Sequence, residues 1–260
     1  MSNDPANAPT LETVAEDSPL PLLFLDGEAL VVDKPAGMPV TPTKAGEQGI
    51  EQLAPDLRFG FRRPPEAVHR LDRDTSGCLL LARNPGALKR FGQAFAAREV
   101  HKLYLGIIAG APQSESGCID LPLDKVSSET LGWWMQPGDN GKAARTFWRC
   151  LATIQGNSLL AFVPLTGRTH QIRAHAYFGL GLPLLHDPVY RNGRTAKPED
   201  SAAKGRTLLH SRHIAFTRPG KNAVSATASM PRDFVNLGFD EATLDQTVLD
   251  GLVLAAHDNG

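Results

Sequence analysis

The sequence predicts an α+β fold, in which one domain is built on a mixed, largely antiparallel central sheet flanked by helices and loops. Short apolar runs typical of strands outnumber the segments with helical spacing. These runs do not alternate with helices in the β-α-β order of a doubly wound fold, and no internal repeat indicates a solenoid. Together these observations favour a single antiparallel-rich core.

Composition is ordinary for a globular chain of 260 residues, with 42% hydrophobic and 21% charged residues. The net charge of −1 gives no global electrostatic argument for a nucleic-acid partner. Basic residues nevertheless recur from Arg58 to Arg98 and again from Arg168 to Arg218. Such a distribution fits either a local polyanion-binding face or an ordinary solvated surface.

The chain is expected to comprise a disordered arm at 1–18, one domain at 19–236, and a C-terminal helical extension or tail at 237–260. The three cysteines are widely spaced and fit reduced, buried thiols better than a disulfide framework or a zinc site. No targeting segment or membrane span is recognisable. We therefore expect a cytoplasmic monomer without membrane association.

In the first half of the chain, three signals are clear. Asp26-Gly27-Glu28 separates two short apolar runs and predicts a hairpin over 20–33. The apolar run Cys78 to Ala82, which follows a turn containing Gly77, predicts a buried strand. Asn84 as N-cap and Pro85 at the first helical position predict a helix over 84–99.

In the second half, helical spacing predicts a helix over 169–179 with Gly179 as its C-cap, and another begins at 230–234. A loop or excursion is expected over 127–141, which carries Trp133 and Trp134. Strands are predicted at 101–109, 117–123, 144–152, 158–164, 207–210 and 214–216.

Several classes of chemistry lack their usual motifs. There is no Gly-x-x-x-x-Gly-Lys-Ser/Thr loop, no Gly-x-Gly-x-x-Gly after a strand and no Gly-x-Ser-x-Gly elbow. His170, His175, His186 and Asp187 suggest a metal site at first sight, with His170 and His175 on one predicted helix. Five positions on a helix separate two side chains by ~140°, however, so they are poorly placed to share one ion. We predict no metal.

Two clusters of charged residues remain, His69 to Asp74 and Gly167 to Arg173. A carboxylate on a loop opposite an arginine on a helix stays ionised at neutral pH, and an ionised, oriented Asp can act as a nucleophile or a base. The alternative is an ion pair that only pins a helix to a sheet. The chemistry of the residues leaves both interpretations open.

Four motifs, however, resemble those of the RluA-type RNA pseudouridine synthases. His69-Arg70-Leu71-Asp72-x-Asp74-Thr75-Ser76-Gly77 is similar to the family's signature, and Val31 to Gly37 to its first motif. Lys102-x-Tyr104 resembles the tyrosine motif. Gly167 to His175, followed by Gly181 to Tyr190, resembles the arginine motif. The resemblance runs from about Leu20 to Phe234, in the family's order, and implies the pseudouridine synthase fold.

The resemblance also implies a function: an isomerase that converts uridines of tRNA or large-subunit rRNA stem-loops to pseudouridine, without a cofactor. Asp72 matches the catalytic aspartate, Tyr104 the tyrosine that stacks on the target base, and Arg173 the arginine paired with that aspartate. Arg70 matches the residue that fills the gap left by the flipped nucleotide. Arg168, Lys34 and His69 are further candidate substrate-binding residues, and His69 is also expected to hydrogen-bond its own loop.

The chain departs from the family pattern at three places. His186 stands where glycine is usual, Arg191 where a small residue is common, and Gly106 near a usual alanine. We expect a compact member without the accessory N-terminal RNA-binding domain. The alternatives are a non-catalytic RNA-binding protein on the same fold and a glycosidase. The glycosidase would need a second carboxylic acid near Asp72, for which Asp74 on the same turn is a poor candidate.

Overall fold

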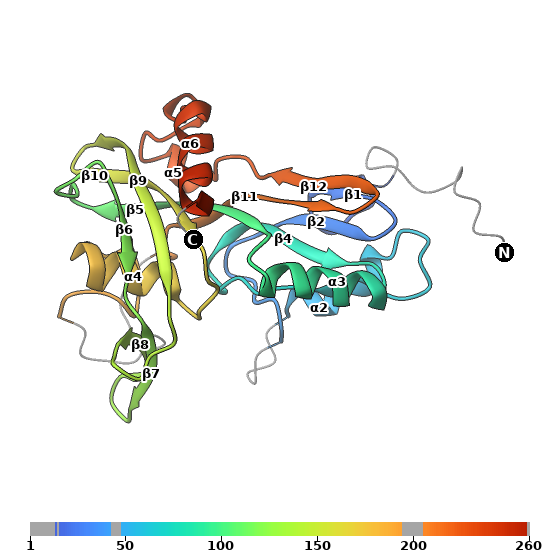
Figure 1. Ribbon diagram of the computed structural model, residues 1–260, viewed down its shortest axis with the longest axis horizontal. Coiled ribbons are helices and arrows are strands. Elements are labelled where there is room, and N and C mark those ends of the chain that lie inside the picture. The colour runs from blue at the N-terminus through green and yellow to red at the C-terminus, as the bar shows by residue number, and fades with distance from the viewer. Residues whose placement is uncertain (1–13, 15, 43–47, 194–204, 259–260) are drawn as a thin grey trace. The chain divides into compact units, whose positions relative to one another are not determined.

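The computed structural model describes residues 14, 16–42, 48–193 and 205–258 (Figure 1). The chain divides into two compact units. Unit 1 comprises Met1–His101 and Ser211–Ser229, and unit 2 comprises Lys102–His210 and Met230–Gly260. The arm expected at 1–18 lies largely outside the described residues, and the domain limits 19 and 236 stay predictions.

Unit 1 is built on a sheet in which β2 pairs with β1 on one side and with β4 on the other, both antiparallel. Strand β11 follows β4 in the strand order, β12 pairs with β11, and β3 pairs with β4. The strands are β1 (Leu22–Leu25), β2 (Ala29–Lys34), β3 (Glu66–Ala67), β4 (Ser76–Ala82), β11 (Leu209–Arg218, of which unit 1 holds the part from Ser211) and β12 (Lys221–Thr227).

All seven residues of β4 are buried, which confirms the predicted buried strand. Alternate residues point to opposite faces of a sheet, so a strand that is buried throughout must be covered on both. On one face Cys78 and Leu80 pack against Ala87 and Phe91 of α3 (Pro85–Ala96). The other face presents Leu79, which is fully buried. Strand β4 therefore gives the residues just before it a rigid support.

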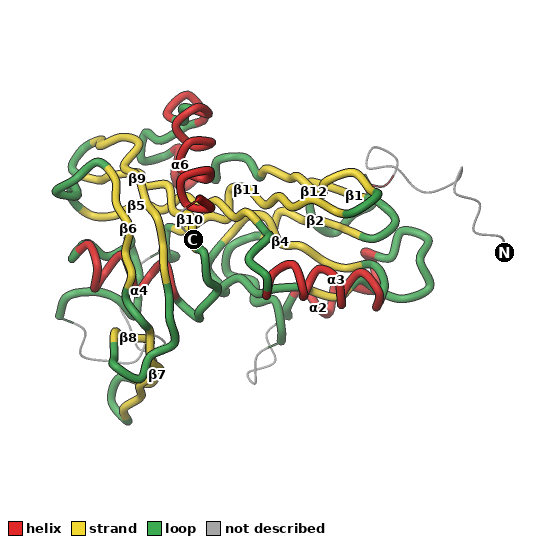
Figure 2. Tube along the Cα trace, in the orientation of Figure 1, coloured by secondary structure: helices red, strands yellow, loops and turns green. Residues whose placement is uncertain are grey.

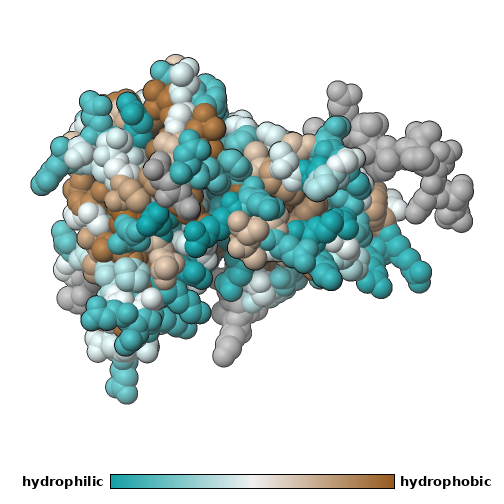
Figure 3. All heavy atoms as spheres, viewed as in Figure 1, coloured by the Kyte–Doolittle hydropathy of each residue, from teal (hydrophilic) through white to brown (hydrophobic). Residues whose placement is uncertain are grey.

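The helices of unit 1 follow local signals. Asn84 Oδ1 accepts a hydrogen bond of 2.9 Å from the N–H of Ala87, so the predicted N-cap of α3 is confirmed. The residues over and around α3 are mainly hydrophilic on the face that Figure 3 shows. Before β3, the short helix α2 (Ile50–Leu53) continues into the 3-10 turn η2 (Ala54–Leu57).

Unit 2 contains an antiparallel sheet in the order β5-β10-β9-β6, and a separate hairpin of two strands (Figure 2). The sheet strands are β5 (His101–Ala109), β6 (Ser116–Asp120), β9 (Arg145–Ile154) and β10 (Asn157–Pro164). The hairpin strands are β7 (Leu123–Ser128) and β8 (Gly132–Pro137). The expectation of a loop or excursion over 127–141 is therefore corrected for Gly132–Pro137, which forms a strand of this hairpin.

Helices cover both faces of this sheet. On one face, Leu159 and Val163 of β10 pack with Leu249 and Leu252 of α6 (Gln246–Asp258). On the other face, side chains of α4 (Gln171–Leu180) reach Thr146 of β9. Helix α5 (Arg232–Val235) and the turn η4 (Glu241–Thr243) precede α6. The C-terminal stretch thus contains a helix that contributes to the unit 2 core, while the predicted division of the chain at 236 stays a prediction.

The C-terminal end of α4 corrects one expectation. Helix α4 runs through Gly179 and is capped by Gly181, which has a left-handed φ of 69°. A Cβ atom at Gly179 would lie 2.6 Å from the side chain of Ile119 in β6. Glycine at 179 thus permits close packing between helix and sheet, a requirement that helical periodicity does not reveal.

The fold class is confirmed: a mixed, largely antiparallel sheet with few helices makes this an α+β fold. The three cysteines are free; Cys78 is buried, with its thiol pKa raised to about 12 by burial, whereas Cys118 is exposed. None of the helices in the described part of the chain is both long and apolar enough to cross a membrane.

Candidate active site

The turn that carries Asp72 lies directly before β4 in unit 1. The N–H of Thr75 donates to the carbonyl of Asp72 at 3.1 Å and closes the turn. Leu71 and Thr75 are buried on either side, while the Asp72 side chain is half-buried. The two buried neighbours fix the backbone, so the carboxylate is held in place and still reaches the surface.

Lys34 fastens this turn to the loop that follows β2. Its side chain is fully buried, and its ammonium donates to the carbonyls of Pro35 (2.8 Å), Met38 (2.7 Å) and Arg73 (2.9 Å). The N–H of Gly37 also donates to the carbonyl of Arg73, at 3.0 Å. An ammonium has three donors, and here each has a carbonyl partner. Lys34 is therefore no solvated loop lysine; its predicted substrate contact stays a prediction.

His69 and Arg70 take different positions. The Nε2 atom of His69 accepts the N–H of Leu80 at 3.1 Å, and the ring stacks on Phe95 with centroids 4.9 Å apart. This hydrogen bond joins His69 to β4 rather than to its own loop, and the predicted substrate contact of His69 stays a prediction. The adjacent Arg70 is exposed, as a side chain that enters an RNA stack must be.

Tyr104 lies in unit 2, on β5, where it pairs with Phe162 of β10 and is 8% exposed. Lys102 precedes it by two residues on the same strand, and burial lowers the pKa of its ammonium to about 8. Gly106 follows by two. A Cβ atom there would lie 2.8 Å from Leu184 and 3.0 Å from Phe162, so glycine suits this position better than alanine would.

Arg173 projects from the first turns of α4 and forms a buried ion pair with Asp187. Its Nε donates to Oδ2 at 2.6 Å and one Nη to Oδ1 at 2.9 Å. Asp187 Oδ1 also accepts the N–H groups of Val189 and Tyr190, at 2.8 and 3.0 Å. The guanidinium lies over the Tyr190 ring, 5.3 Å from its centroid. This bidentate geometry sets the orientation of Arg173.

Polar contacts inside the unit hold α4 in place. Gln171 Nε2 donates to Thr146 Oγ1 at 2.9 Å, and its Oε1 accepts the Thr166 hydroxyl at 2.7 Å. His175 Nδ1 lies 2.9 Å from Thr146 Oγ1, and Nε2 lies 3.1 Å from the carbonyl of Leu121. Because a carbonyl only accepts, Nε2 carries the proton of the neutral ring. Burial lowers the pKa of His175, which favours this neutral form.

Arg168 is half-buried on the turn before α4, and its Nε donates to the carbonyl of Ala143 at 3.1 Å. His170, at the start of the helix, has a left-handed φ of 52° and lies with Nδ1 3.2 Å from the Tyr190 hydroxyl. Both histidines on which a metal interpretation would depend are therefore engaged with protein groups. Among the described residues, no cluster of three metal-ligating side chains occurs.

The predicted site residues thus fall into two groups. Unit 1 holds Asp72, Arg70, His69 and Lys34, and unit 2 holds Tyr104, Arg173 and Arg168. The pairing of Asp72 with Arg173 joins the two units and stays a prediction. Sequence reasoning did not single out Asp187 as a partner of Arg173. A signal was present, because an acidic residue in the apolar stretch 182–190 needs a buried partner.

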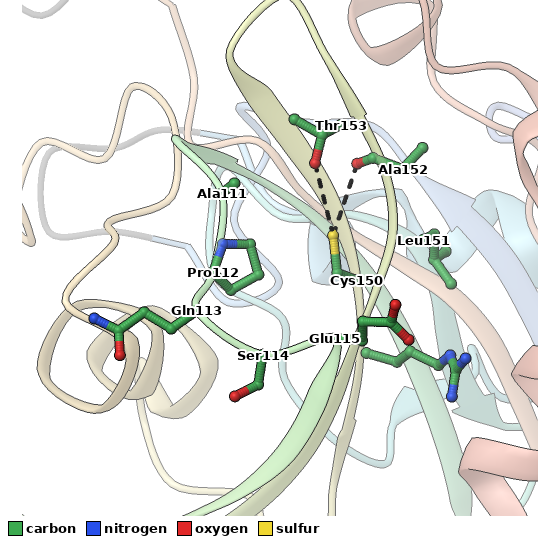
Figure 4. A pocket seen from close by; sticks show the side chains of 10 residues that line it. Ala111, Pro112, Gln113, Ser114, Glu115, Cys150, Leu151, Ala152 and Thr153 are labelled. Carbon is green, nitrogen blue, oxygen red and sulfur yellow. Dashed lines mark hydrogen bonds between the residues drawn. The ribbon is translucent and has the colours of Figure 1, made fainter.

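A surface hollow in unit 2 is separate from these residues (Figure 4). The loop 111–115 and residues 149–153 of β9 line it, and none of them is a predicted site residue. Cys150 Sγ lies 3.9 Å from both the carbonyl of Ala152 and the hydroxyl of Thr153. No charged group is buried there, so the hollow has no catalytic constellation comparable to that around Arg173.

Comparisons with known proteins agree with this arrangement. Residues 28–177 match the RNA pseudouridylate synthase family model. An uncharacterised RNA pseudouridine synthase of Zymomonas mobilis is 48% identical, over 84% of this chain and 97% of the relative. Ribosomal large subunit pseudouridine synthase D of the same organism is 36% identical, over 84% and 71%. A structure of human RNA pseudouridylate synthase domain containing 4 superposes with a TM-score of 0.68 at 26% identity, over 82% and 90%. The chain therefore belongs to the RNA pseudouridylate synthase family.

Proposed function

We propose that this chain converts uridine to pseudouridine in RNA with Asp72 as its reactive group, assisted by Tyr104 and Arg173. The observation that carries this proposal is the match over residues 28–177, which includes all three residues. The relatives reported above are named as synthases, which supports catalysis over the alternative of an RNA-binding protein without activity.

The reaction needs no co-reactant. The bond between ribose C1′ and uracil N1 breaks, the base rotates, and a bond forms between C1′ and C5. The proton lost from C5 is balanced by one gained at N1, so substrate and product are isomers. An ionised Asp72 supplies either a nucleophile or a negative charge that stabilises the sugar. A guanidinium close to it favours that ionised form, which is the role proposed for Arg173.

The uridine must leave its stack before these atoms become accessible, and this costs a few kcal/mol. Arg70 is exposed, and a planar guanidinium can stack in the vacated space. Tyr104 is proposed to stack on the extruded base. The half-buried Arg168 is proposed to contact phosphate, the usual source of affinity for RNA.

We propose a stem-loop of large-subunit rRNA or of tRNA as the substrate. Two relatives, one from Zymomonas mobilis and one from Xanthomonas campestris, are named ribosomal large subunit pseudouridine synthase D, and this supports the rRNA. We also propose that the protein works as a monomer in the cytoplasm, where free cysteines such as Cys78 stay reduced. Light scattering and cell fractionation test these two points.

The decisive experiment compares the native protein with Asp72→Asn on labelled tRNA and large-subunit rRNA. Native protein is expected to form pseudouridine in one of them. Asp72→Asn is expected to form none, yet to bind the RNA within about twofold of native, because the side chain keeps its size and loses a single charge. Asp74→Asn, on the same turn, is the matched control and should retain turnover. Equal turnover in Asp72→Asn and native protein would contradict the assignment.

A further inference from the structure

The β7–β8 hairpin exposes an aromatic side chain that the proposed reaction does not use. Trp133, the second residue of β8, is 42% exposed, although tryptophan is usually among the more buried residues. The surface over this hairpin is hydrophilic or near neutral in Figure 3. An exposed indole among polar groups is typical of a surface that binds a partner.

The indole is held in one orientation. It stacks on the imidazole of His170, with centroids 4.7 Å apart and planes at 24°. His170 is in turn positioned by the Tyr190 hydroxyl, 3.2 Å from its Nδ1 atom. A planar group that is already oriented loses little conformational freedom when a second planar group stacks on it.

The hairpin itself is anchored to the elements that orient Arg173. The Tyr190 hydroxyl accepts the N–H of Met135 in β8 at 2.9 Å. Met135 and Tyr190 belong to one buried cluster with Ala174 of α4. Strand β7 is also tied down, through paired backbone hydrogen bonds of 3.0 and 2.9 Å between Leu123 and Lys142. A ligand on Trp133 would therefore be bound to the same rigid cluster that positions Arg173.

Cationic groups accompany the indole. The Lys125 ammonium lies 4.9 Å from the Trp133 ring centroid, and Lys125 is exposed. Arg168, two residues before His170, is half-buried. An aromatic platform with movable cations beside it matches single-stranded nucleic acid, whose bases stack while its phosphates meet the cations. Acidic Asp124 and Glu129 on the same hairpin make a purely electrostatic polyanion site a poorer explanation.

We propose that Trp133, backed by His170, is a binding site for an unpaired nucleobase of the RNA substrate, outside the residues assigned to the target uridine. This inference rests on the proposed function, because the RNA is the occupant. The stacked base would fix the register of the RNA strand relative to Arg173. Lys125 would leave the indole for a phosphate when the base arrives.

The test compares a ten-nucleotide oligoadenylate, which has unpaired bases and phosphates, with inorganic polyphosphate, which has negative charge but no bases. Oligoadenylate is expected to quench the tryptophan fluorescence of the native protein, and polyphosphate is expected to leave it unchanged. Trp133→Leu should lose this quenching and bind oligoadenylate about tenfold more weakly, the range known for loss of one base–aromatic stack. Trp133→Phe keeps an aromatic ring, so its loss of binding free energy should be about half of that in Trp133→Leu, or less.

Trp134→Phe is the matched control. Trp134 is the next residue on β8, so it points to the opposite face, and its indole N–H donates to Gln136 at 3.2 Å. This variant should keep both quenching and affinity. Thermal unfolding within about 2 °C of native shows that each variant is folded.

The inference is overturned if Trp133→Leu binds oligoadenylate within twofold of native, or if polyphosphate quenches equally. Both readouts are independent of turnover, so they separate this inference from the proposed activity. Normal turnover with unchanged binding in Trp133→Leu rejects the base site alone. Failure of native protein to form pseudouridine, with quenching intact, rejects the activity alone.

Discussion

Asp187 receives two hydrogen bonds from the Arg173 guanidinium and one from each of the backbone N–H groups of Val189 and Tyr190. Removing one charge of a buried, hydrogen-bonded pair is far more costly than removing one of an exposed pair. We predict that Asp187→Asn lowers the free energy of unfolding by about 3–5 kcal/mol, measured by urea titration. Because Arg173 loses its orienting partner, turnover should fall as well.

The ion pair of Arg206 with Asp233 offers a matched control with the same bidentate form. Its distances are 2.6 and 3.0 Å, but the Asp233 side chain is 40% exposed. Asp233→Asn should therefore cost no more than about 1 kcal/mol. Equal destabilisation by the two substitutions would show that burial does not set the strength of the Arg173 pair.

A second prediction for a single residue concerns Lys34. Lys34→Met preserves most of the apolar stem but leaves the carbonyls of Pro35, Met38 and Arg73 without their ammonium donor. Hydrogen bonds to a charged group contribute about 1.5–3 kcal/mol each, so a loss of several kcal/mol is expected. Hydrogen exchange at the Gly37 amide, which bonds to Arg73, should accelerate.

Lys221→Met is the control for this change, because Lys221 is 52% exposed and pairs with Glu28 at 2.8 Å. It should alter stability by less than about 1 kcal/mol. Protection at Gly37 that is unchanged in Lys34→Met would mean that the lysine does not brace the Asp72 turn.

These residues show what the sequence can predict and what it cannot. The motif that contains Lys34 was recognisable, whereas its partner Arg73 is 39 positions away and follows only from the fold. His186 is similar. It has a left-handed φ of 62°, which explains why glycine is usual at this position, but the sequence alone does not reveal the backbone angle.

At the level of elements, local signals predicted most boundaries well. Strand β5 spans the predicted 101–109, and α3 begins after the predicted cap. The β7–β8 hairpin was missed, because Gly132 and polar residues resemble a loop and its partners lie elsewhere in unit 2. Strand β12 was missed too, since the exposed residues that alternate along it leave a weak apolar signal.

Helix α4 depends on a histidine that must remain neutral. Burial lowers the pKa of His175 below its ordinary 6.5, so the unfolded chain binds this proton at a higher pH than the folded one. The free energy of unfolding should therefore fall as the pH drops below 6.5. His175→Gln cannot take up a proton and should show a shallower pH dependence in urea titrations at pH 5 to 7.5. Parallel curves for the two proteins would contradict this mechanism.

At the scale of the whole molecule, each unit is assembled from two separate stretches of chain. The core of unit 1 includes Ile214, Phe216 and Val224 from the later stretch, and the core of unit 2 includes Phe234 and Leu249. The chain passes from one unit to the other after His101, His210 and Ser229. Neither unit therefore has its complete core until the C-terminal fifty residues are present.

This arrangement predicts different outcomes for two truncations. A chain that ends at residue 245 lacks only α6, whose Leu249, Leu252 and Ala256 belong to the unit 2 core. Hydrogen exchange should then show weakened protection in β5 and β10, while β4 in unit 1 stays protected. A chain that ends at residue 210 lacks core residues of both units, so protection should be lost in β4 as well as in β5.

The control for the chain that ends at residue 245 is Leu254→Ala, because Leu254 lies on α6 but is 62% exposed. It should leave protection in both units unchanged, whereas Leu249→Ala should cost about 2–5 kcal/mol in unit 2. If ending the chain at 245 removes protection from β4 to the same extent as from β10, the two units unfold as one. The cooperative unit of stability would then be the whole chain rather than each unit by itself.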